Sequence, residues 1–234
     1  MEIRIESLLE GAARARGGAV AVIDVFRAFT SAAVALAEGA ERIIMVGTVE
    51  EAQMLRAQGA GQLCIGEVGG KAPPGFDFGN SPVEILEGSR RGAAFGGKTV
   101  IQRTGAGTQG IVAAQANADR LYAASLVTAI ATARALTSTG IELISLLAMG
   151  NRAIERTDED EICALHLRNL LQGRPGDAAA VRNLILAGGE IADFRDPERP
   201  RLNPGDLDIA LDIDRYHFAI AVVMENGRAV AKKG

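Results

Sequence analysis

The sequence predicts an α/β protein: a three-layer α/β/α fold around a mainly parallel sheet, with a β-hairpin appended near the C-terminal end. Two observations lead to this prediction. Short β-rich runs alternate with helical segments along most of the chain, which is the pattern of parallel strands joined by crossover helices. Most of these runs are apolar at nearly every position, as in strands covered on both faces. The 234 residues, 48% of them hydrophobic, suffice for one large core, so we expect a single domain over residues 1–234.

The expected strands are short runs rich in aliphatic residues. They cover residues 2–7, 19–25, 42–46, 62–67, 98–103, 120–125 and 141–149. Helices are expected over residues 27–39, 48–58, 82–91, 108–117, 127–138, 158–172 and 177–188. Thr48, with Glu51 three residues later, forms a capping box at the start of the second helix. The last apolar runs flank Asn226-Gly227, a dipeptide typical of hairpin turns, and this predicts the C-terminal hairpin.

Composition limits the classes of partner. The net charge is −4, whereas nucleic-acid binding requires a basic surface that neutralises phosphates. No apolar run approaches the roughly 20 residues of a membrane span, and the two cysteines, Cys64 and Cys163, have neither disulfide-framework nor zinc-site spacing. We therefore expect a cytoplasmic protein that binds neither nucleic acid nor membrane. A small anionic substrate is still allowed, because it needs only a few local cations. Assembly into a homo-oligomer is compatible with this composition.

Ligands of open α/β sheets bind at the carboxyl ends of the strands, so residues just past each predicted strand are candidates for a site. Asp24 and Arg27 follow the apolar run AVAVI. Asp24 could hold a metal ion or accept a proton, and Arg27 could bind an oxyanion. The alternative is that Asp24 only caps the next helix while Arg27 is solvated.

Glu67, in the segment CIGEVGG, ends another predicted strand. A carboxylate across a cleft from Asp24 would suit Mg²⁺, which prefers oxygen ligands and keeps several waters. The alternative is a turn that merely requires glycine.

Two further loops contain groups suited to anions. In GFDFGNSP, Asn80 and Ser81 precede a proline that suits the first turn of a helix, so Ser81 is expected to be the N-cap, with anion-binding amides beside it. In IQRTGAGTQG, amides up to Gly107 and Thr108 could cradle an oxyanion with Arg103 as the counter-charge. This segment is neither a Walker A motif nor a complete dinucleotide fingerprint.

A fifth segment, ERTDEDEICALHL, concentrates acidic residues at a helix start. Taken alone, it is explained by Thr157 as a cap and by Glu159 and Asp160 complementing the helix dipole. His166 lies among leucines on the same helix, and we interpret it as a partly buried structural residue.

In order along the chain, VIDVFRAFTSAAVALAEGA, GEVGG, GFDFGNSP, GAGTQG and EDEICA resemble the motifs of the 2-phosphosulfolactate phosphatase (ComB) family. The likeness extends from about residue 19 to residue 172. It implies a three-layer α/β/α, Mg²⁺-dependent phosphoric monoester hydrolase that converts 2-phosphosulfolactate to 3-sulfolactate and phosphate in coenzyme M biosynthesis. The matching polar residues are Asp24, Arg27, Glu67, Asp77, Asn80, Ser81, Gly107, Thr108, Glu159 and Asp160.

The resemblance and the strand-end positions together assign roles to these residues. The catalytic candidates are Asp24, Arg27 and Glu67, and the metal-ligand candidates are Asp24, Glu67, Glu159 and Asp160. The substrate-binding candidates are Asn80, Ser81, Arg103, Gly107 and Thr108. Three positions depart from the family pattern: Val68 replaces an arginine, while Ala106 and Thr128 each replace an asparagine. Because these departures remove donors for a sulfonate, the alternatives are a related 2-phospho-hydroxyacid as substrate or a non-catalytic binder of a phosphorylated or sulfonated metabolite.

Overall fold

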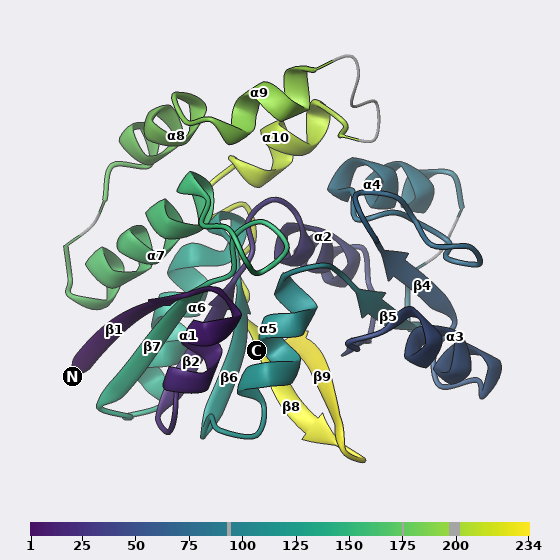
Figure 1. The fold of residues 1–234 in the computed structure, drawn as a ribbon, viewed down its shortest axis with the longest axis horizontal. Helices are drawn as coiled ribbons and strands as arrows, with labels where there is room; N and C mark the ends of the chain where they lie inside the picture. The colour runs from purple at the N-terminus through teal and green to yellow at the C-terminus, as the bar shows by residue number, and fades with distance from the viewer. Residues whose placement is uncertain (93–94, 175, 197–201) are drawn as a thin grey trace.

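The computed structural model describes residues 1–92, 95–174, 176–196 and 202–234 (Figure 1). Its centre is one nine-stranded sheet in the order β1-β7-β2-β6-β8-β9-β3-β5-β4. The strands are β1 (Glu2–Ser7), β2 (Ala19–Ile23), β3 (Arg42–Met45), β4 (Leu63–Gly66), β5 (Thr99–Arg103), β6 (Arg120–Ala124), β7 (Leu143–Ala148), β8 (Ile220–Glu225) and β9 (Arg228–Lys233). Every predicted strand is confirmed, with ends that differ by at most two residues.

The helices predicted from the sequence are also confirmed. They are α2 (Ala28–Ala37), α3 (Val49–Ala57), α4 (Pro82–Arg90), α5 (Gly107–Ala114), α6 (Ala129–Ser138), preceded by the 3₁₀ turn η1 (Leu126–Thr128), α7 (Asp158–Leu171) and α8 (Ala178–Leu186). Thr48 caps α3 by accepting the Glu51 amide at 3.1 Å. The sequence patterns did not predict α1 (Leu8–Arg14), α9 (Glu190–Arg195) and α10 (Gly205–Ala210), because helices of six or seven residues are too short to show an apolar period. Within the described residues, no helix has the length and apolar character needed to cross a bilayer.

The helices cover both faces of the sheet, which confirms the three-layer α/β/α prediction. In β2, Val20 and Val22 pack with α1, α2 and α5 in one core. Ala19, Ala21 and Ile23 face the opposite way, into a second core with α6 and α7. Alternate residues of a strand point to opposite faces of the sheet. A strand that is buried on both faces must therefore be apolar at every position.

The C-terminal hairpin is confirmed, but it is an interior part of the sheet and not an attachment to its edge. β8 pairs antiparallel with β6, and β9 pairs antiparallel with β3 (Figure 1). Without the hairpin, the parallel set β1-β7-β2-β6 would be separated from the set β3-β5-β4. The alternating pattern predicts a hairpin, whereas its place depends on pairing with strands far away in the sequence.

We expect the hairpin to contribute strongly to stability because its inner face belongs to the main core. Val222 is buried there, and its neighbour Val223 is 45% exposed. Replacing Val222→Ala should lower the free energy of unfolding by about 1.5–3 kcal/mol, whereas Val223→Ala should change it by less than about 0.5 kcal/mol. Urea denaturation followed by circular dichroism measures both values. Equally small effects would show that the hairpin is peripheral to the core.

Candidate active site

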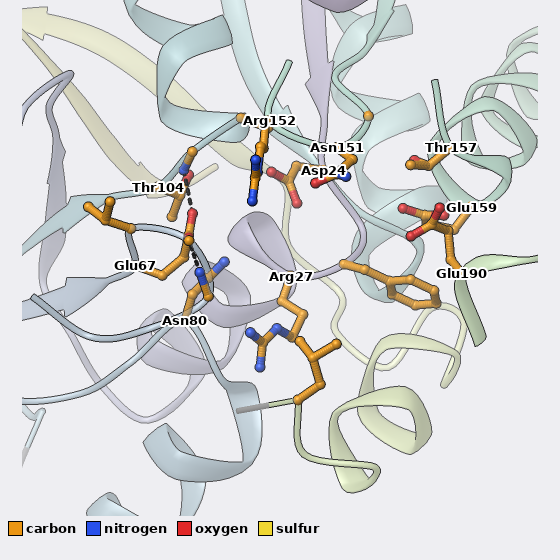
Figure 2. A pocket seen from close by; sticks show the side chains of 18 of the residues that line it. Asp24, Arg27, Glu67, Asn80, Thr104, Asn151, Arg152, Thr157, Glu159 and Glu190 are labelled. Atoms are coloured by element: carbon orange, nitrogen blue, oxygen red, sulfur yellow. Dashed lines mark hydrogen bonds between the residues drawn. The ribbon is translucent and has the colours of Figure 1, made fainter. Parts of the chain in front are cut away.

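A cavity of about 510 Å³ lies at the carboxyl ends of the parallel strands (Figure 2). It lies where open α/β sheets place their ligands. Loops that follow β2, β4, β5 and β7 form its walls, together with residues of α9. The described residues that line it are Asp24, Phe26, Arg27, Glu67, Val68, Gly69, Gly70, Asn80, Arg103, Thr104, Gly105, Ala106, Gly150, Asn151, Arg152, Thr157, Glu159, Glu190, Phe194 and Leu202.

Asp24 follows β2 and is fixed by two backbone amides. Its Oδ1 accepts the Ala28 amide at 2.9 Å, and its Oδ2 accepts the Gly107 amide at 2.8 Å. The side chain therefore holds the start of α2, as the capping alternative expected, and it also lines the cavity. Burial raises the pKa of Asp24 to about 6, with a smaller contribution from the charge of Glu67, while the two amide bonds act in the opposite direction.

Glu67 follows β4 and is fixed in the same manner. Its Oε1 accepts the Gly105 amide at 2.6 Å, and its Oε2 accepts the Gly70 amide at 2.7 Å (Figure 2). The preceding Gly66 has φ +140°, and a Cβ there would lie 1.8 Å from the Arg103 carbonyl oxygen. Only glycine allows β4 to approach β5 this closely and still place Glu67 on the cavity wall.

The start of α5 holds carboxylates, although the sequence predicted an oxyanion cradle there. The Gly105 and Gly107 amides donate to Glu67 and Asp24, and the Thr108 amide donates to Thr104 Oγ1 at 3.1 Å. Gly107 and Thr108 are buried behind the cavity and do not line it. Their direct part in substrate binding therefore stays a prediction, and the hydrogen bonds show that they position the neighbouring carboxylate and turn.

Arg27 lines the cavity, but a carboxylate already balances its charge. Its Nη1 donates to Asp206 Oδ2 at 2.6 Å, and Asp206 is completely buried. Asp206 Oδ1 also accepts Ser81 Oγ at 2.7 Å. Ser81 accepts the Glu84 amide at 3.2 Å, which confirms it as the N-cap of α4, and it does not line the cavity.

Two other predicted binding residues do reach the cavity. Arg103 lines it and donates from Nη1 to the Glu67 carbonyl at 2.7 Å and from Nε to the Gly47 carbonyl at 3.3 Å. Asn80 also lines it, and its buried Oδ1 lacks a hydrogen-bond partner among the described residues. A buried acceptor without a partner is costly, so this atom is available to a donor on a ligand.

The two acidic residues at the start of α7 have different surroundings. Glu159 lines the cavity, and its buried Oε2 has no hydrogen-bond partner in the described part of the chain. Burial raises the pKa of Glu159 to about 8. Asp160 does not line the cavity, and its carboxylate accepts the Val25 amide at 2.7 Å and the Gly150 amide at 2.8 Å. It ties the loop after β7 to the residue that follows Asp24.

Three of the four predicted metal ligands therefore share one cavity: Asp24, Glu67 and Glu159. Over the described ranges, no three histidine, cysteine or acidic side chains are close enough to form a metal cluster. Figure 2 shows Glu67 and Glu159 on opposite sides of Asp24. The arrangement therefore offers separate carboxylates and not a complete protein cage.

Several residues of the site were not predicted from the sequence. Thr104, Asn151, Arg152, Glu190 and Phe194 line the cavity, and Asp206 balances Arg27. The strand-end rule could have identified Asn151 and Arg152, because they follow Gly150 just beyond β7. No local signal connects Asp206 to Arg27, which is far away in the sequence.

Comparison with known proteins gives one consistent result. A family model described as 2-phosphosulpholactate phosphatase matches residues 5–192. The probable 2-phosphosulfolactate phosphatase of Carboxydothermus hydrogenoformans is 39% identical over 144 residues, which is 62% of this chain and 57% of that protein. The protein of the same description from Deinococcus radiodurans is 38% identical over 55% of this chain and 52% of its own length. The one from Thermus thermophilus is 33% identical over 77% of this chain and 74% of its own length.

The raised carboxyl pKa values predict how stability depends on pH in the metal-free protein. The pKa of Asp24 is about 6 and that of Glu159 about 8, both above the ordinary values of 3.8 and 4.5. The folded state binds these protons more tightly than the unfolded state does. The resulting stabilisation is complete below about pH 4 and is lost as pH rises towards 8. Urea denaturation in EDTA should therefore give a lower free energy of unfolding at pH 8 than at pH 5.

Glu159→Gln tests the origin of that loss. The variant should flatten the decrease between about pH 6 and pH 8, because its side chain cannot ionise. Glu142→Gln, an exposed carboxylate outside the cavity, is the matched control and should retain the decrease. A decrease of equal size in the wild type and Glu159→Gln would contradict this interpretation.

Proposed function

The chain belongs to the 2-phosphosulfolactate phosphatase family, and on this basis we propose that it hydrolyses the phosphate ester of 2-phosphosulfolactate or a related 2-phospho-hydroxyacid. One observation carries the proposal: a cavity at the strand ends in which Asp24 and Glu67 are oriented by backbone amides and share the wall with three arginine side chains. Such a cavity suits a small, highly charged substrate.

Phosphate monoesters hydrolyse very slowly in water, so an enzyme must position the attacking group and neutralise the charge that develops on the phosphoryl oxygens. In this cavity, carboxylates of fixed orientation could position a water molecule, and Arg152 and Arg103 could face the anion. The products are 3-sulfolactate, or the corresponding hydroxyacid, and phosphate.

Two carboxyl groups have pKa values suited to proton transfer near neutral pH. In the metal-free site Asp24 has a pKa of about 6, which suits it to accept the proton of the attacking water as the new P–O bond forms. A cation bound to Asp24 would lower that pKa and would make Asp24 a ligand in place of a base. Glu159, with a pKa of about 8, is protonated at neutral pH and would donate its proton to the leaving oxygen as the ester P–O bond breaks. The two transfers leave the overall proton balance of the hydrolysis unchanged.

Mg²⁺ is the proposed cofactor. This ion is usually held by one or two carboxylates together with waters and substrate phosphates. Asp24 and Glu67 fit that requirement, because each of their oxygens accepts only one hydrogen bond from the described residues and both side chains line the cavity. When bound, the ion would neutralise charge on the phosphoryl oxygens. Asp160 remains only a more distant candidate, since both of its oxygens accept backbone amides and its side chain does not line the cavity.

Other parts of the functional prediction have support from composition and resemblance alone. They are a step in coenzyme M biosynthesis, a cytoplasmic location, a homo-oligomeric state and the absence of nucleic-acid partners. We retain each of them as a proposal.

Phosphate release tests the reaction directly. Purified protein incubated with 2-phosphosulfolactate, phospholactate and phosphoglycolate should release inorganic phosphate with Mg²⁺ and lose that activity in EDTA. Activity that changes neither when Mg²⁺ is added nor when EDTA is added would contradict the metal proposal. Thermal stabilisation by 2-phosphosulfolactate without phosphate release would instead support the non-catalytic binder.

Asp24→Asn should lower turnover by a factor of about 100 or more, because the amide cannot accept the proton or bind the cation as a carboxylate does. The matched control is Asp119→Asn, which changes a carboxylate that accepts the Gly18 amide at 2.8 Å outside the cavity. Circular dichroism should show folded protein for both variants. Near-normal turnover of Asp24→Asn would leave Asp24 with only its helix-capping role.

A further inference from the structure

Among the described residues, three guanidinium groups line the cavity, and they have different partners. Arg27 forms an ion pair with the buried Asp206. Arg103 is held by two backbone carbonyls, those of Gly47 and Glu67. Arg152 is exposed and makes no hydrogen bond or ion pair with any described residue. Arg152 is therefore the lining cation whose hydrogen-bond donors are not already used by described protein groups.

The loop that carries Arg152 is held at three places. The Asn151 amide donates to the Glu155 carbonyl at 2.8 Å and closes the neck of the loop. At the base, Asp160 accepts the Gly150 amide at 2.8 Å. On the far side, the Leu9 amide donates to the Ala153 carbonyl at 3.2 Å. These contacts hold the backbone from which the Arg152 side chain extends into the cavity (Figure 2).

The backbone at Arg152 has an unfavourable conformation. Arg152 has φ +53° and Ala153 has φ +62°, so two consecutive residues that are not glycine occupy the left-handed region. Such conformations carry an energetic cost, and they persist where surrounding structure enforces them, commonly at binding sites. Here the enforced conformation directs a guanidinium group at the cavity and leaves the next exposed side chain, Ile154, outside it.

We infer that Arg152 binds an oxoanion group of the substrate, either the phosphoryl group or the sulfonate. A guanidinium group presents planar paired donors that match the geometry of oxoanions. This inference rests on the proposed function for the identity of the substrate, but not for the presence of an anion site. The main anion-binding residue is then Arg152, which the sequence did not indicate, and not Arg27, whose charge Asp206 balances.

The test measures binding of the two reaction products by isothermal titration calorimetry, with Mg²⁺ and with EDTA. The probes are inorganic phosphate and 3-sulfolactate, and the variant is Arg152→Gln. The matched control is Arg156→Gln, because Arg156 belongs to the same segment, lies outside the cavity and pairs with Glu161 at 2.7 Å. Arg152→Gln should weaken binding of at least one probe by about 10- to 150-fold, while the control should stay within about threefold of the wild type.

The two probes locate the subsite. Weaker binding of phosphate assigns Arg152 to the phosphoryl group, and kcat/KM should then fall by a similar factor for esters with and without a sulfonate. Weaker binding of 3-sulfolactate alone assigns it to the sulfonate, and the loss should then be confined to 2-phosphosulfolactate, mainly in KM. Unchanged binding of both probes, or no binding to the wild type, would overturn the inference.

This design separates the inference from the proposed function. Absence of phosphate release from every ester by the wild type would refute the hydrolase proposal. The binding comparison would still decide whether Arg152 forms an anion site. Circular dichroism and thermal unfolding of Arg152→Gln would establish that the variant is folded. We expect this because the Arg152 side chain makes no hydrogen bond or ion pair with a described residue.

Discussion

Carboxylates held by backbone amides connect the loops at the carboxyl edge of this sheet. Asp24, Glu67 and Asp160 each accept two amides, and these bonds connect the segments after β2, β4, β5 and β7. Each charge-assisted bond is worth about 1.5–3 kcal/mol, yet burial of the charge costs more, so the pKa values of Asp24 and Asp160 remain raised. The loops are ordered at the expense of a desolvation penalty that a bound cation or proton would relieve.

The interior hairpin joins the two parallel sets of strands whose carboxyl ends carry the site residues. Asp24, Glu159 and Arg152 come from the segments after β2 and β7, whereas Glu67 and Arg103 come from β4 and β5 in the other parallel set. β8 and β9 join the two sets, and α5 crosses between them because it follows β5 but packs on α1 and β2. The Gly107 amide at its start therefore reaches Asp24 from the other half of the sheet. Hairpin and crossover helix together bring the two groups of side chains into one cavity.

Local patterns predicted what depends on local physics. Apolar runs specify strands, and Thr48 and Ser81 specify helix starts. The strand-end rule identified Asp24 and Glu67 as cavity residues, whereas Glu159 was a candidate only through the family resemblance. The pairing of Arg27 with Asp206 across 179 positions left no local trace. Nor could spacing show that the amides around Gly107 donate to carboxylates of the chain itself, because a glycine-rich helix start has the same sequence whichever anion it binds.

The charge balance of the cavity also limits how it can bind an anion. In the described part of the chain, four carboxylates and three arginines line it, and Asp206 already neutralises one of these arginines. The carboxylates are those of Asp24, Glu67, Glu159 and Glu190. Two like charges 6 Å apart repel by about 3 kcal/mol at an effective dielectric constant of about 20, so ionised carboxylates would oppose a phosphate ester. Protonation of Glu159, whose pKa is about 8, removes one of these charges at neutral pH. Asp24, with a pKa of about 6, is mostly ionised there. A divalent cation beside Asp24 and Glu67 would convert this repulsion into attraction, which is the physical reason to expect that an acidic cavity and an anionic substrate belong to one site.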